Sequence, residues 1–299
     1  MMTFLMIGAH PDDMDLDCGG LAVLMHRRGH RVIFLSMTNG NAGHMSIISE
    51  ELRVRRSQEM AEAARLYGGI RYETMDIDDG YLTPDIPTRD RLIRYIRKEK
   101  PDVIITHRSC DYHPDHRACG QLVMDCSYLV GVPLICPDVP ALHTHPVILY
   151  CEDRFTMPAP FRPDLAVRCD EAVDQQIQGV LAHRSQLLEW LPYDGHWTDV
   201  LEATSEEEAI ARLRERLQKR FSAPVERFPD AFPEKTTYGE VFQIDEYGGP
   251  MTDEIREVIT GKQSWAGDFP LHAWSLLPDL PKQAADTLPS LISCAWQYP

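Results

Sequence analysis

Three ionisable side chains, His10, Asp12 and Asp13, come directly after a short apolar segment near the start of the chain. This segment, residues 3–7, is predicted to be a strand, and an apolar helical pattern follows the turn. The carboxyl end of a first strand is where open α/β sheets usually bind ligands. An imidazole beside carboxylates suits Zn²⁺ or another divalent ion. Because consecutive residues point in different directions, one carboxylate can bind metal while the other moves protons.

A second cluster with the same context appears later in the chain. Residues 101–107 form another apolar stretch that is predicted to be a buried strand, and it leads into Asp111, His113, Asp115 and His116. Two histidines at this spacing at the start of a helix can both reach one pocket. Since each cluster follows a strand and precedes a helix, we expect both at the same edge of one sheet.

The two clusters resemble the signatures of a known family. Residues 9–13 read Ala-His-Pro-Asp-Asp and residues 113–116 read His-Pro-Asp-His, as in the LmbE-like (PIG-L) zinc-dependent N-acetylglucosaminyl deacetylases. Further matching stretches are residues 38–44, 56–59, 79–82 and 183–186. The ordered combination is far more specific than any one motif.

The resemblance implies a role for each residue of the two motifs. It assigns His10, Asp13 and His116 as ligands of Zn²⁺, and the alternative of another divalent metal such as Fe²⁺ stays open. It implies that Asp12 is the general base that takes a proton from the attacking water. His113 is then the candidate for oxyanion stabilisation, as a protonated imidazole, and for proton donation to the leaving amine.

Four further residues are candidates for substrate binding. The resemblance places a substrate-binding Arg and Asp at Arg56 and Asp79. Taken alone, Arg56 would be a solvated helix residue and Asp79 an ordinary turn residue. Tyr112, just before the second motif, could polarise the carbonyl or serve as a packing ring. His44 is a weaker candidate, on a loop that is expected to face the site.

Two acidic residues are predicted to support the site from behind. Asp115 is expected to orient His113 or to cap the helix, not to bind metal. The acidic residue that the family commonly has directly after the Asp-Asp pair is Met14 here. Asp15, one place later, is the candidate substitute.

The charge and cysteine pattern limit the class of protein. The formal net charge is −16 with no basic block, which argues against general binding of nucleic acids or anionic membranes. No stretch has the length of a membrane span, and no signal peptide is recognised at the N-terminus. The 8 cysteines form no C-x-x-C pair, which predicts reduced thiols and a cytoplasmic protein. A homo-oligomer stays open.

The alternation of apolar strands and amphipathic helices predicts an α/β fold. We expect a Rossmann-like, mostly parallel sheet flanked by helices, in a single domain spanning residues 1–299. Its core would cover about residues 1–245, followed by a C-terminal extension, 246–299, of unknown role. Strands are predicted at 3–7, 31–37, 70–75, 101–107, 147–151, 164–168 and 239–245. Helices are predicted at 16–28, 49–67, 88–100, 116–130, 171–190 and 205–221.

These features favour a metal-dependent hydrolase that removes an N-acetyl group from a 2-acetamido sugar or its conjugate. One alternative is an amidase with the same metal site that acts on a non-sugar or thiol-conjugate substrate. Another is a sugar- or nucleotide-binding α/β protein without catalysis. The glycine-rich dinucleotide fingerprint is missing after the first strand, and no G-x-S-x-G elbow is present.

Overall fold

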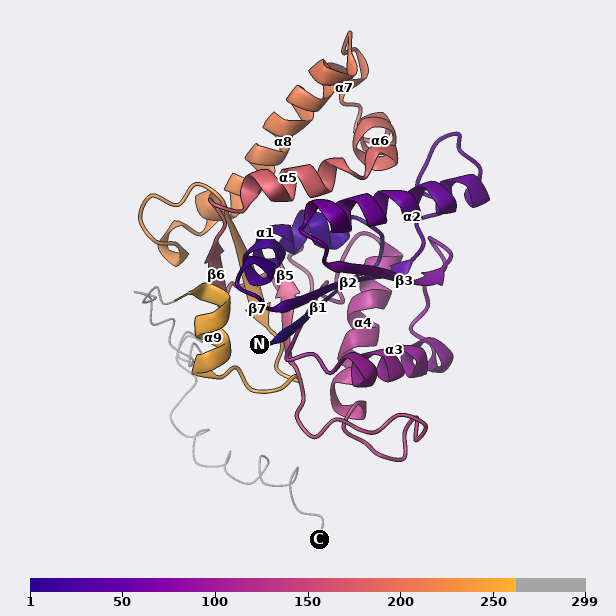
Figure 1. The fold of residues 1–299 in the computed structure, drawn as a ribbon, viewed down its shortest axis with the longest axis vertical. Helices are drawn as coiled ribbons and strands as arrows, with labels where there is room; N and C mark the ends of the chain where they lie inside the picture. Colours follow the sequence, from indigo (N-terminus) through magenta and orange to yellow (C-terminus); the bar gives the residue numbers. More distant parts are fainter. Residues whose placement is uncertain (262–299) are drawn as a thin grey trace, which may run out of the picture. The chain divides into compact units, whose positions relative to one another are not determined.

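The structure, a computed structural model, describes residues 1–261, which form an α/β fold around one mostly parallel sheet (Figure 1). Within these residues the sheet has seven strands in the order β3-β2-β1-β4-β5-β7-β6. The strands are β1 (Thr3–Gly8), β2 (Arg31–Thr38), β3 (Arg71–Ile77), β4 (Val103–Thr106), β5 (Val147–Cys151), β6 (Leu165–Arg168) and β7 (Gly239–Ile244). Only β7 runs antiparallel to its two neighbours, β5 and β6. The predicted fold class is confirmed.

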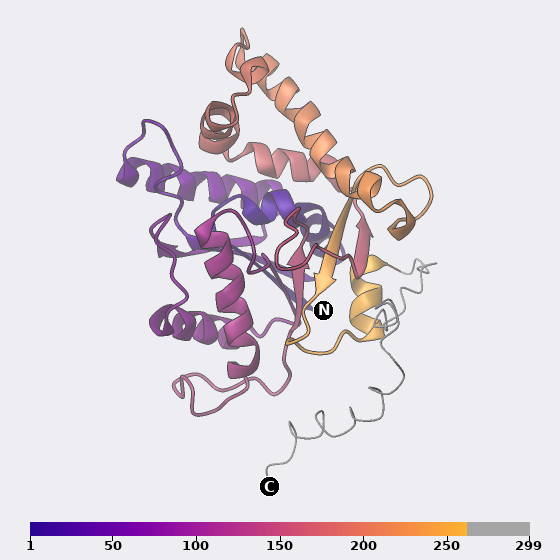
Figure 2. The ribbon, with the colours of Figure 1, turned by 180° about the vertical axis from the view of Figure 1, so that it is seen from behind.

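Helices cover both faces of the sheet. They are α1 (Asp13–Arg27), α2 (Ser49–Leu66), α3 (Ile86–Glu99), α4 (Pro114–Leu129), α5 (Val173–Leu181), α6 (Leu191–Asp194), α7 (Thr198–Leu201), α8 (Glu206–Arg227) and α9 (Asp253–Thr260). Helices α1, α2 and α5 lie on one face, whereas α3 and α4 lie on the other (Figures 1 and 2). No helix in residues 1–261 is long and apolar enough to cross a membrane.

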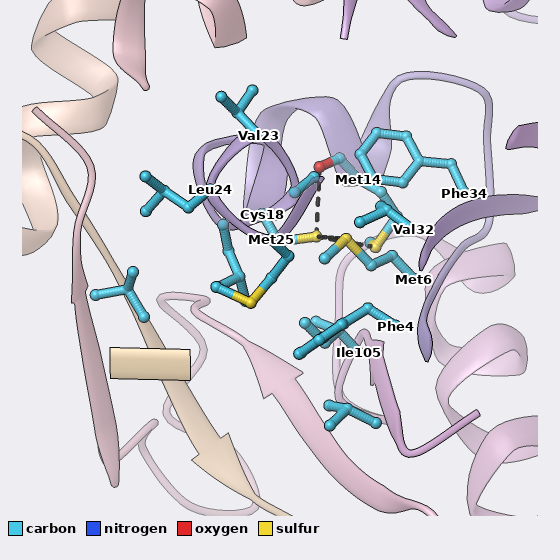
Figure 3. Packing of buried hydrophobic residues seen from close by; sticks show 14 of the residues in the cluster. Phe4, Met6, Met14, Cys18, Val23, Leu24, Met25, Val32, Phe34 and Ile105 are labelled. Atoms are coloured by element: carbon cyan, nitrogen blue, oxygen red, sulfur yellow. Dashed lines mark hydrogen bonds between the residues drawn. The ribbon is translucent and has the colours of Figure 1, made fainter. Parts of the chain in front are cut away.

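Alternate residues of the central strands fill two separate hydrophobic cores. Phe4 and Met6 of β1 pack under α1, where the Cys18 thiol contacts the sulfur of Met6 (Figure 3). Leu5 and Ile7, the residues between them, face the α3 and α4 side. This two-sided burial explains why the strand is apolar throughout, as expected for a parallel sheet covered on both faces.

The order of the strands brings the two polar clusters together. From β1 the chain moves outward through β2 and β3, and then returns to place β4 on the other side of β1. The turn after β1 and the turn after β4 therefore leave the sheet side by side at its carboxyl edge. This is the topological switch point at which doubly wound sheets bind ligands.

Two predicted helices differ from the helices in the structure: one begins at another residue, and the other is interrupted. Thr88 is not the cap of α3, because the carboxylate of Asp85 accepts the Thr88 N–H at 2.8 Å and the helix begins at Ile86. The predicted helix over 171–190 is broken after α5 and resumes as a π-helix at Ser185–Trp190.

The break depends on a residue that is distant in sequence. Glu59 of α2 accepts both the backbone N–H and the hydroxyl of Ser185, each at 2.7 Å. These bonds satisfy the start of the second segment and offset the lost helical bonds. At the C-terminal end, β7 is followed by α9, and residues 262–299 of the predicted extension lie outside the described residues.

Candidate active site

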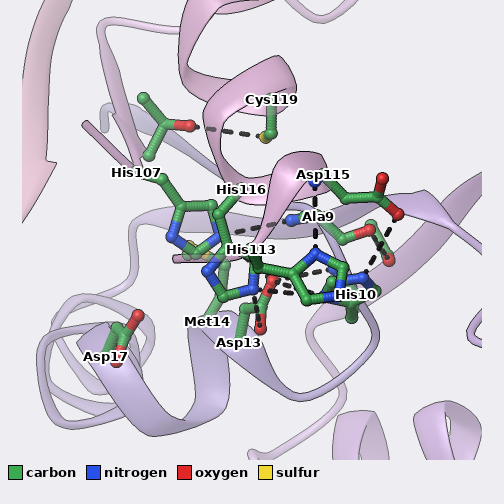
Figure 4. A network of polar contacts seen from close by, with 12 residues as sticks. Ala9, His10, Asp13, Met14, Asp17, His107, His113, Asp115, His116 and Cys119 are labelled. Carbon is green, nitrogen blue, oxygen red and sulfur yellow. Dashed lines mark hydrogen bonds and ion pairs between the residues drawn. The ribbon is translucent and has the colours of Figure 1, made fainter. Parts of the chain in front are cut away.

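Three of the predicted side chains, those of His10, Asp13 and His116, lie close together with their polar atoms facing one another (Figure 4). The Nδ1 atom of His10 lies 3.2 Å from Nε2 of His116 and 3.6 Å from Oδ2 of Asp13. The other oxygen of Asp13 lies 3.5 Å from Nε2 of His116. His10 and Asp13 come from the turn after β1 and the start of α1, while His116 lies on the first turn of α4.

This arrangement has the size of a divalent metal site. In a tetrahedral zinc site with bonds of about 2.0–2.1 Å, the ligand atoms lie about 3.3–3.4 Å apart. The separations of 3.2, 3.5 and 3.6 Å fall close to that value, the last two being measured to different oxygens of the Asp13 carboxylate. Two imidazoles and a carboxylate are also a common donor set for a catalytic zinc, so the residues fit the ion that the family resemblance implies.

A second layer of carboxylates holds the two imidazoles. Nε2 of His10 lies 3.2 Å from Asp79 and 3.4 Å from Asp115, and Nδ1 of His116 lies 3.2 Å from Asp111. Such partners fix the tautomer and orientation of a metal-binding histidine. Asp79, expected at the substrate, thus contacts His10. The Asp115 carboxylate also meets His10, not the ring of His113.

His107, at the end of β4, completes the cluster. Its Nε2 lies 3.0 Å from Oδ2 of Asp13 and 3.3 Å from the backbone nitrogen of Ala9, and its ring stacks on that of His116 with centroids 4.3 Å apart. Burial alone would raise the pKa of Asp13, yet the charges of His116 and His107 hold it well below its usual range. Burial lowers the pKa of His116, but Asp13 and Asp111 raise it to about 10. The centre therefore stabilises positive charge.

Asp12 has an unusual backbone conformation that separates its carboxylate from that of Asp13. Its φ is 115°, in the left-handed half of the map, which costs about 1–3 kcal/mol for a residue other than glycine. As a result Asp13 faces the histidines, while Asp12 lines the cavity and meets Arg56. Burial raises the pKa of Asp12, and the charge of Arg56 opposes that rise.

Arg56 lies beneath the site and is only 2% exposed. Its Nη2 donates to Oδ1 of Asp12 at 3.1 Å and to the carbonyl of Pro11. The Nε and Nη1 atoms have no hydrogen-bond partner among residues 1–261. Gly40 makes room for this side chain, because a Cβ there would meet Nε at 2.8 Å. Arg56 is neither a solvated helix residue nor a fully satisfied structural one.

His113 is one of the residues that line the cavity. It caps α4, since its Nδ1 accepts the Asp115 N–H at 3.2 Å. Nδ1 can accept only in the neutral tautomer that carries its proton on Nε2, so Nε2 is a donor. Burial and the charges of His10 and His116 lower the pKa of His113. These features favour a neutral donor over the protonated imidazole that the sequence led us to expect.

The remaining substrate candidates have different surroundings. Tyr112 stands at the mouth of the cavity, 74% exposed, with its ring edge-on to those of His113 and His116. His44 does not line the cavity. Its Nε2 bonds to Glu189 at 2.9 Å and its Nδ1 accepts two backbone N–H groups, so the ring ties its loop to the π-helix. These contacts do not favour a substrate-binding role for His44.

Asp15 is fully buried behind the site. Its Oδ2 accepts the hydroxyl of Tyr72 at 2.7 Å and lies 3.3 Å from Nε2 of His183. The same tyrosine hydroxyl accepts the backbone N–H of Asp12 at 2.8 Å. Asp15 therefore reaches the Asp12 backbone through Tyr72, on β3.

The cluster opens into a cavity of about 1450 Å³. Its floor contains His10, Asp12 and Asp13 at the carboxyl edge of the sheet. Its walls come from the π-helix, α8 and the segment after β5, and they include the aromatic side chains Tyr112, Phe155, Trp190, Trp197 and Phe221. The volume exceeds the roughly 300–1,000 Å³ of most small-molecule pockets.

Sequence reasoning missed two of the residues that shape this site. His107 follows a predicted strand just before the second cluster, and that position could have marked it as a candidate. Tyr72 carried no such signal, because only the order of the strands places β3 next to β2 and brings this ring under the turn after β1.

The fold and the site together define an α/β protein with a candidate divalent-metal centre at the switch point of its sheet. Residues 5–127 match the sequence model of the family described as "GlcNAc-PI de-N-acetylase", PIG-L. This range includes every residue of the centre from His10 to His116. These residues are therefore similar to the PIG-L (LmbE-like) family, the family that the two motifs predicted.

Individual relatives are deacetylases by name. The chain is 25% identical over 203 residues to "Diacetylchitobiose deacetylase" of Thermococcus kodakarensis, covering 63% of this chain and 73% of that protein. It is 28% identical over 137 residues to "Probable N-acetyl-alpha-D-glucosaminyl L-malate deacetylase 2" of Bacillus subtilis, covering 42% of this chain and 60% of that one.

Solved structures share the fold at lower identity. An N,N'-diacetylchitobiose deacetylase from Pyrococcus horikoshii superposes with a TM-score of 0.66 at 22% identity, covering 82% of this chain and 84% of that one. A 4-carboxy-2-hydroxymuconate hydratase from Pseudomonas putida gives 0.64 at 18% identity, covering 84% and 98%. Since the fold is shared by a hydratase, the reaction has to be argued from the site.

Proposed function

We propose that this protein is a metal-dependent hydrolase that removes an N-acetyl group from a 2-acetamido sugar or a GlcNAc conjugate. The observation that carries the proposal is the convergence of His10, Asp13 and His116 at metal-ligand spacing, with Asp12 beside them in the same cavity. The names of the relatives support the deacetylase reaction and the amino-sugar substrate.

In this proposal the three ligands hold a divalent ion, with zinc favoured by the donor set. When bound, the ion would polarise the acetamide carbonyl and make water a stronger nucleophile at neutral pH. Asp12 takes the proton of the attacking water, since its carboxylate faces the cavity and is not one of the three ligands. His113 donates from Nε2 to the oxygen that becomes negative.

The cavity supports a substrate larger than one sugar ring. Its volume of about 1450 Å³ leaves room for a second ring or another conjugated group beyond the acetamide. Tyr112 and the tryptophans offer faces that can pack on sugar rings. We propose that Arg56 and Asp79 contribute indirectly, through Asp12 and His10, and that Tyr112 contacts the substrate at the mouth.

The test is acetate release from a panel of substrates. The panel should contain N-acetylglucosamine, N,N'-diacetylchitobiose, a GlcNAc conjugate, and N-acetyl amino acids as non-sugar amides. We expect acetate from the sugars, its loss after chelation, and its return with added zinc. Turnover of only the non-sugar amides would favour the amidase alternative. No turnover by protein with a full complement of metal would contradict the proposed reaction.

A further inference from the structure

Asp12 sits in a conformation that its own sequence does not favour. Its φ of 115° is uncommon for an aspartate, and its side chain caps no helical N–H of α1. The residue is 7% exposed, so its backbone N–H needs a partner inside the protein. Something outside the motif must therefore hold this turn.

The hydroxyl of Tyr72 is that partner. It accepts the Asp12 N–H at 2.8 Å and donates to Oδ2 of Asp15 at 2.7 Å, so its donor and its acceptor capacity are both used. Burial and the nearby Asp15 carboxylate raise the pKa of Tyr72 well above its usual value, which keeps the hydroxyl protonated. The direction of both hydrogen bonds is thereby fixed.

The far end of this chain of contacts is anchored in two other elements. Asp15 is on α1 and is fully buried, with Nε2 of His183 at 3.3 Å. The ring of Tyr72 meets that of Phe34 on β2 edge-on, with centroids 5.2 Å apart. The hydroxyl cannot move away from Asp12 without breaking this packing.

We propose that Tyr72 is a positioning residue for the reaction, which keeps the Asp12 backbone in its left-handed conformation and so aims the Asp12 carboxylate into the cavity. The inference rests on the proposed role of Asp12 as general base. It also gives Asp15 a role, since Asp15 holds the tyrosine hydroxyl in place. Tyr72 touches neither the predicted ligands nor the cavity, and it acts through Asp12 alone.

The test compares Tyr72→Phe with Tyr95→Phe. Tyr95 is a matched control, because its hydroxyl also donates to a carboxylate, that of Glu73, at 2.7 Å, but it does not line the cavity. We expect Tyr72→Phe to lower kcat about 10- to 100-fold with KM and metal content unchanged. Tyr95→Phe should keep kcat, after correction for folded protein by thermal unfolding.

A double variant shows whether Tyr72 acts through Asp12. In the Asp12→Asn background, Tyr72→Phe should cause less than about a twofold further loss, because the group it positions is already inactive. A further loss as large as in the wild-type background would overturn the inference. If Tyr72→Phe does not fold, Asp15→Asn carries the same comparison, with a smaller loss in the same direction.

Crystal structures of the wild type and of Tyr72→Phe supply a readout without activity. We expect the φ of Asp12 to leave the positive range and its carboxylate to leave Arg56. An unchanged Asp12 in the variant would contradict the inference. If the wild type shows no deacetylase activity while the variant shows this backbone change, the proposed function fails but the positioning by Tyr72 stands.

Discussion

Two arginines are almost completely buried in this protein, and their surroundings are opposite. Arg97, near the end of α3, is 1% exposed, and all the hydrogen bonds found for it go to backbone carbonyls. These carbonyls belong to Leu129, Val130, Val132, Ile135, Cys136 and Val139. Arg56, at the other edge of the sheet, shares one guanidinium nitrogen between a carbonyl and Asp12, and leaves two nitrogens without a hydrogen bond.

The two arginines differ in how fully their hydrogen-bond donors are used, and this difference helps to distinguish a structural buried charge from a functional one. Arg97 organises the loop after α4, because its bonds satisfy carbonyls that would otherwise be buried without a partner. Arg56 leaves hydrogen-bonding capacity unused beside a reactive carboxylate, which costs stability. A similar contrast holds for acids: the Glu240 carboxylate accepts the backbone N–H groups of Gly20 and Leu21, whereas the Asp12 carboxylate accepts from the side chain of Arg56.

The largest effect is expected for Asp12→Asn. Asparagine tolerates a positive φ and keeps the size of the side chain, but it cannot take a proton. We expect kcat/KM to fall about 10²- to 10⁴-fold, with metal content and thermal stability retained. Asp76→Asn is the control, since Asp76 also has a positive φ and also pairs with an arginine of α2, Arg53. Full activity in Asp12→Asn would remove Asp12 from the mechanism.

Arg97→Met should lower stability and leave activity unchanged, the opposite of what we expect for Asp12→Asn. It leaves several buried carbonyls without a donor, so the free energy of unfolding should fall by about 3 kcal/mol or more, while kcat per folded molecule stays constant. Denaturant unfolding measures this. Arg94→Met, on the same helix but paired with Asp138 at the surface, should cost less than about 1 kcal/mol. A loss of activity without a loss of stability in Arg97→Met would contradict the purely structural role of Arg97.

Glu240 should make stability depend on pH. Burial raises its pKa from 4.5 to about 7, against the hydrogen bonds from Leu21, Gly20 and Gln176. Between these two pKa values the folded protein holds a proton that the unfolded chain releases, so the contribution of Glu240 to stability falls as pH rises through this window. Across the whole window, the contribution of Glu240 to the free energy of unfolding falls by about 3 kcal/mol.

Glu240→Gln removes this titration. The difference in unfolding free energy between the wild type and the variant should therefore shift in favour of the variant from pH 4.5 to pH 7. Denaturant titrations at both pH values measure the shift. A difference that stays constant with pH would show that Glu240 is charged throughout, and that its hydrogen bonds outweigh its burial.

The smallest effect is expected for Arg56→Lys. A lysine keeps the charge but cannot hold the Pro11 carbonyl and the Asp12 carboxylate with a rigid fork. We expect kcat/KM to fall about tenfold, the size of one lost hydrogen bond to a charged group. Arg53→Lys, an exposed pair with Asp76 on the same helix, should leave activity unchanged. Equal activities in the two variants would place Arg56 with Arg97 as a structural residue.

The sequence predicted the parts of the site that depend on local order. A strand, a polar turn and a helix place His10, Asp13 and His116 at one sheet edge, and no knowledge of distant contacts is needed. The contacts behind them could not be predicted in this way. Tyr72 reaches Asp12 only because β3 lies two strands from β1, and Glu59 breaks a helix with which it has no local relation.

The exact positions of the helix ends could not be predicted from the sequence either. Thr88 and Asp85 are both good caps, and only the structure shows that the carboxylate of Asp85 captures the Thr88 N–H. The role of Arg56 was similarly open, because an arginine on a polar helix is usually solvated. Its burial is compatible only with a small residue at Gly40, where a Cβ would meet the guanidinium Nε at 2.8 Å.

We propose above that His10, Asp13 and His116 hold a divalent ion. Elemental analysis of protein purified without added metal, beside the His116→Ala variant, tests it most directly. We predict about one ion per chain in the wild type, with zinc favoured, and its loss in the variant. Metal-free protein even after reconstitution, or equal metal in both proteins, would contradict the claim and favour a binding protein without catalysis.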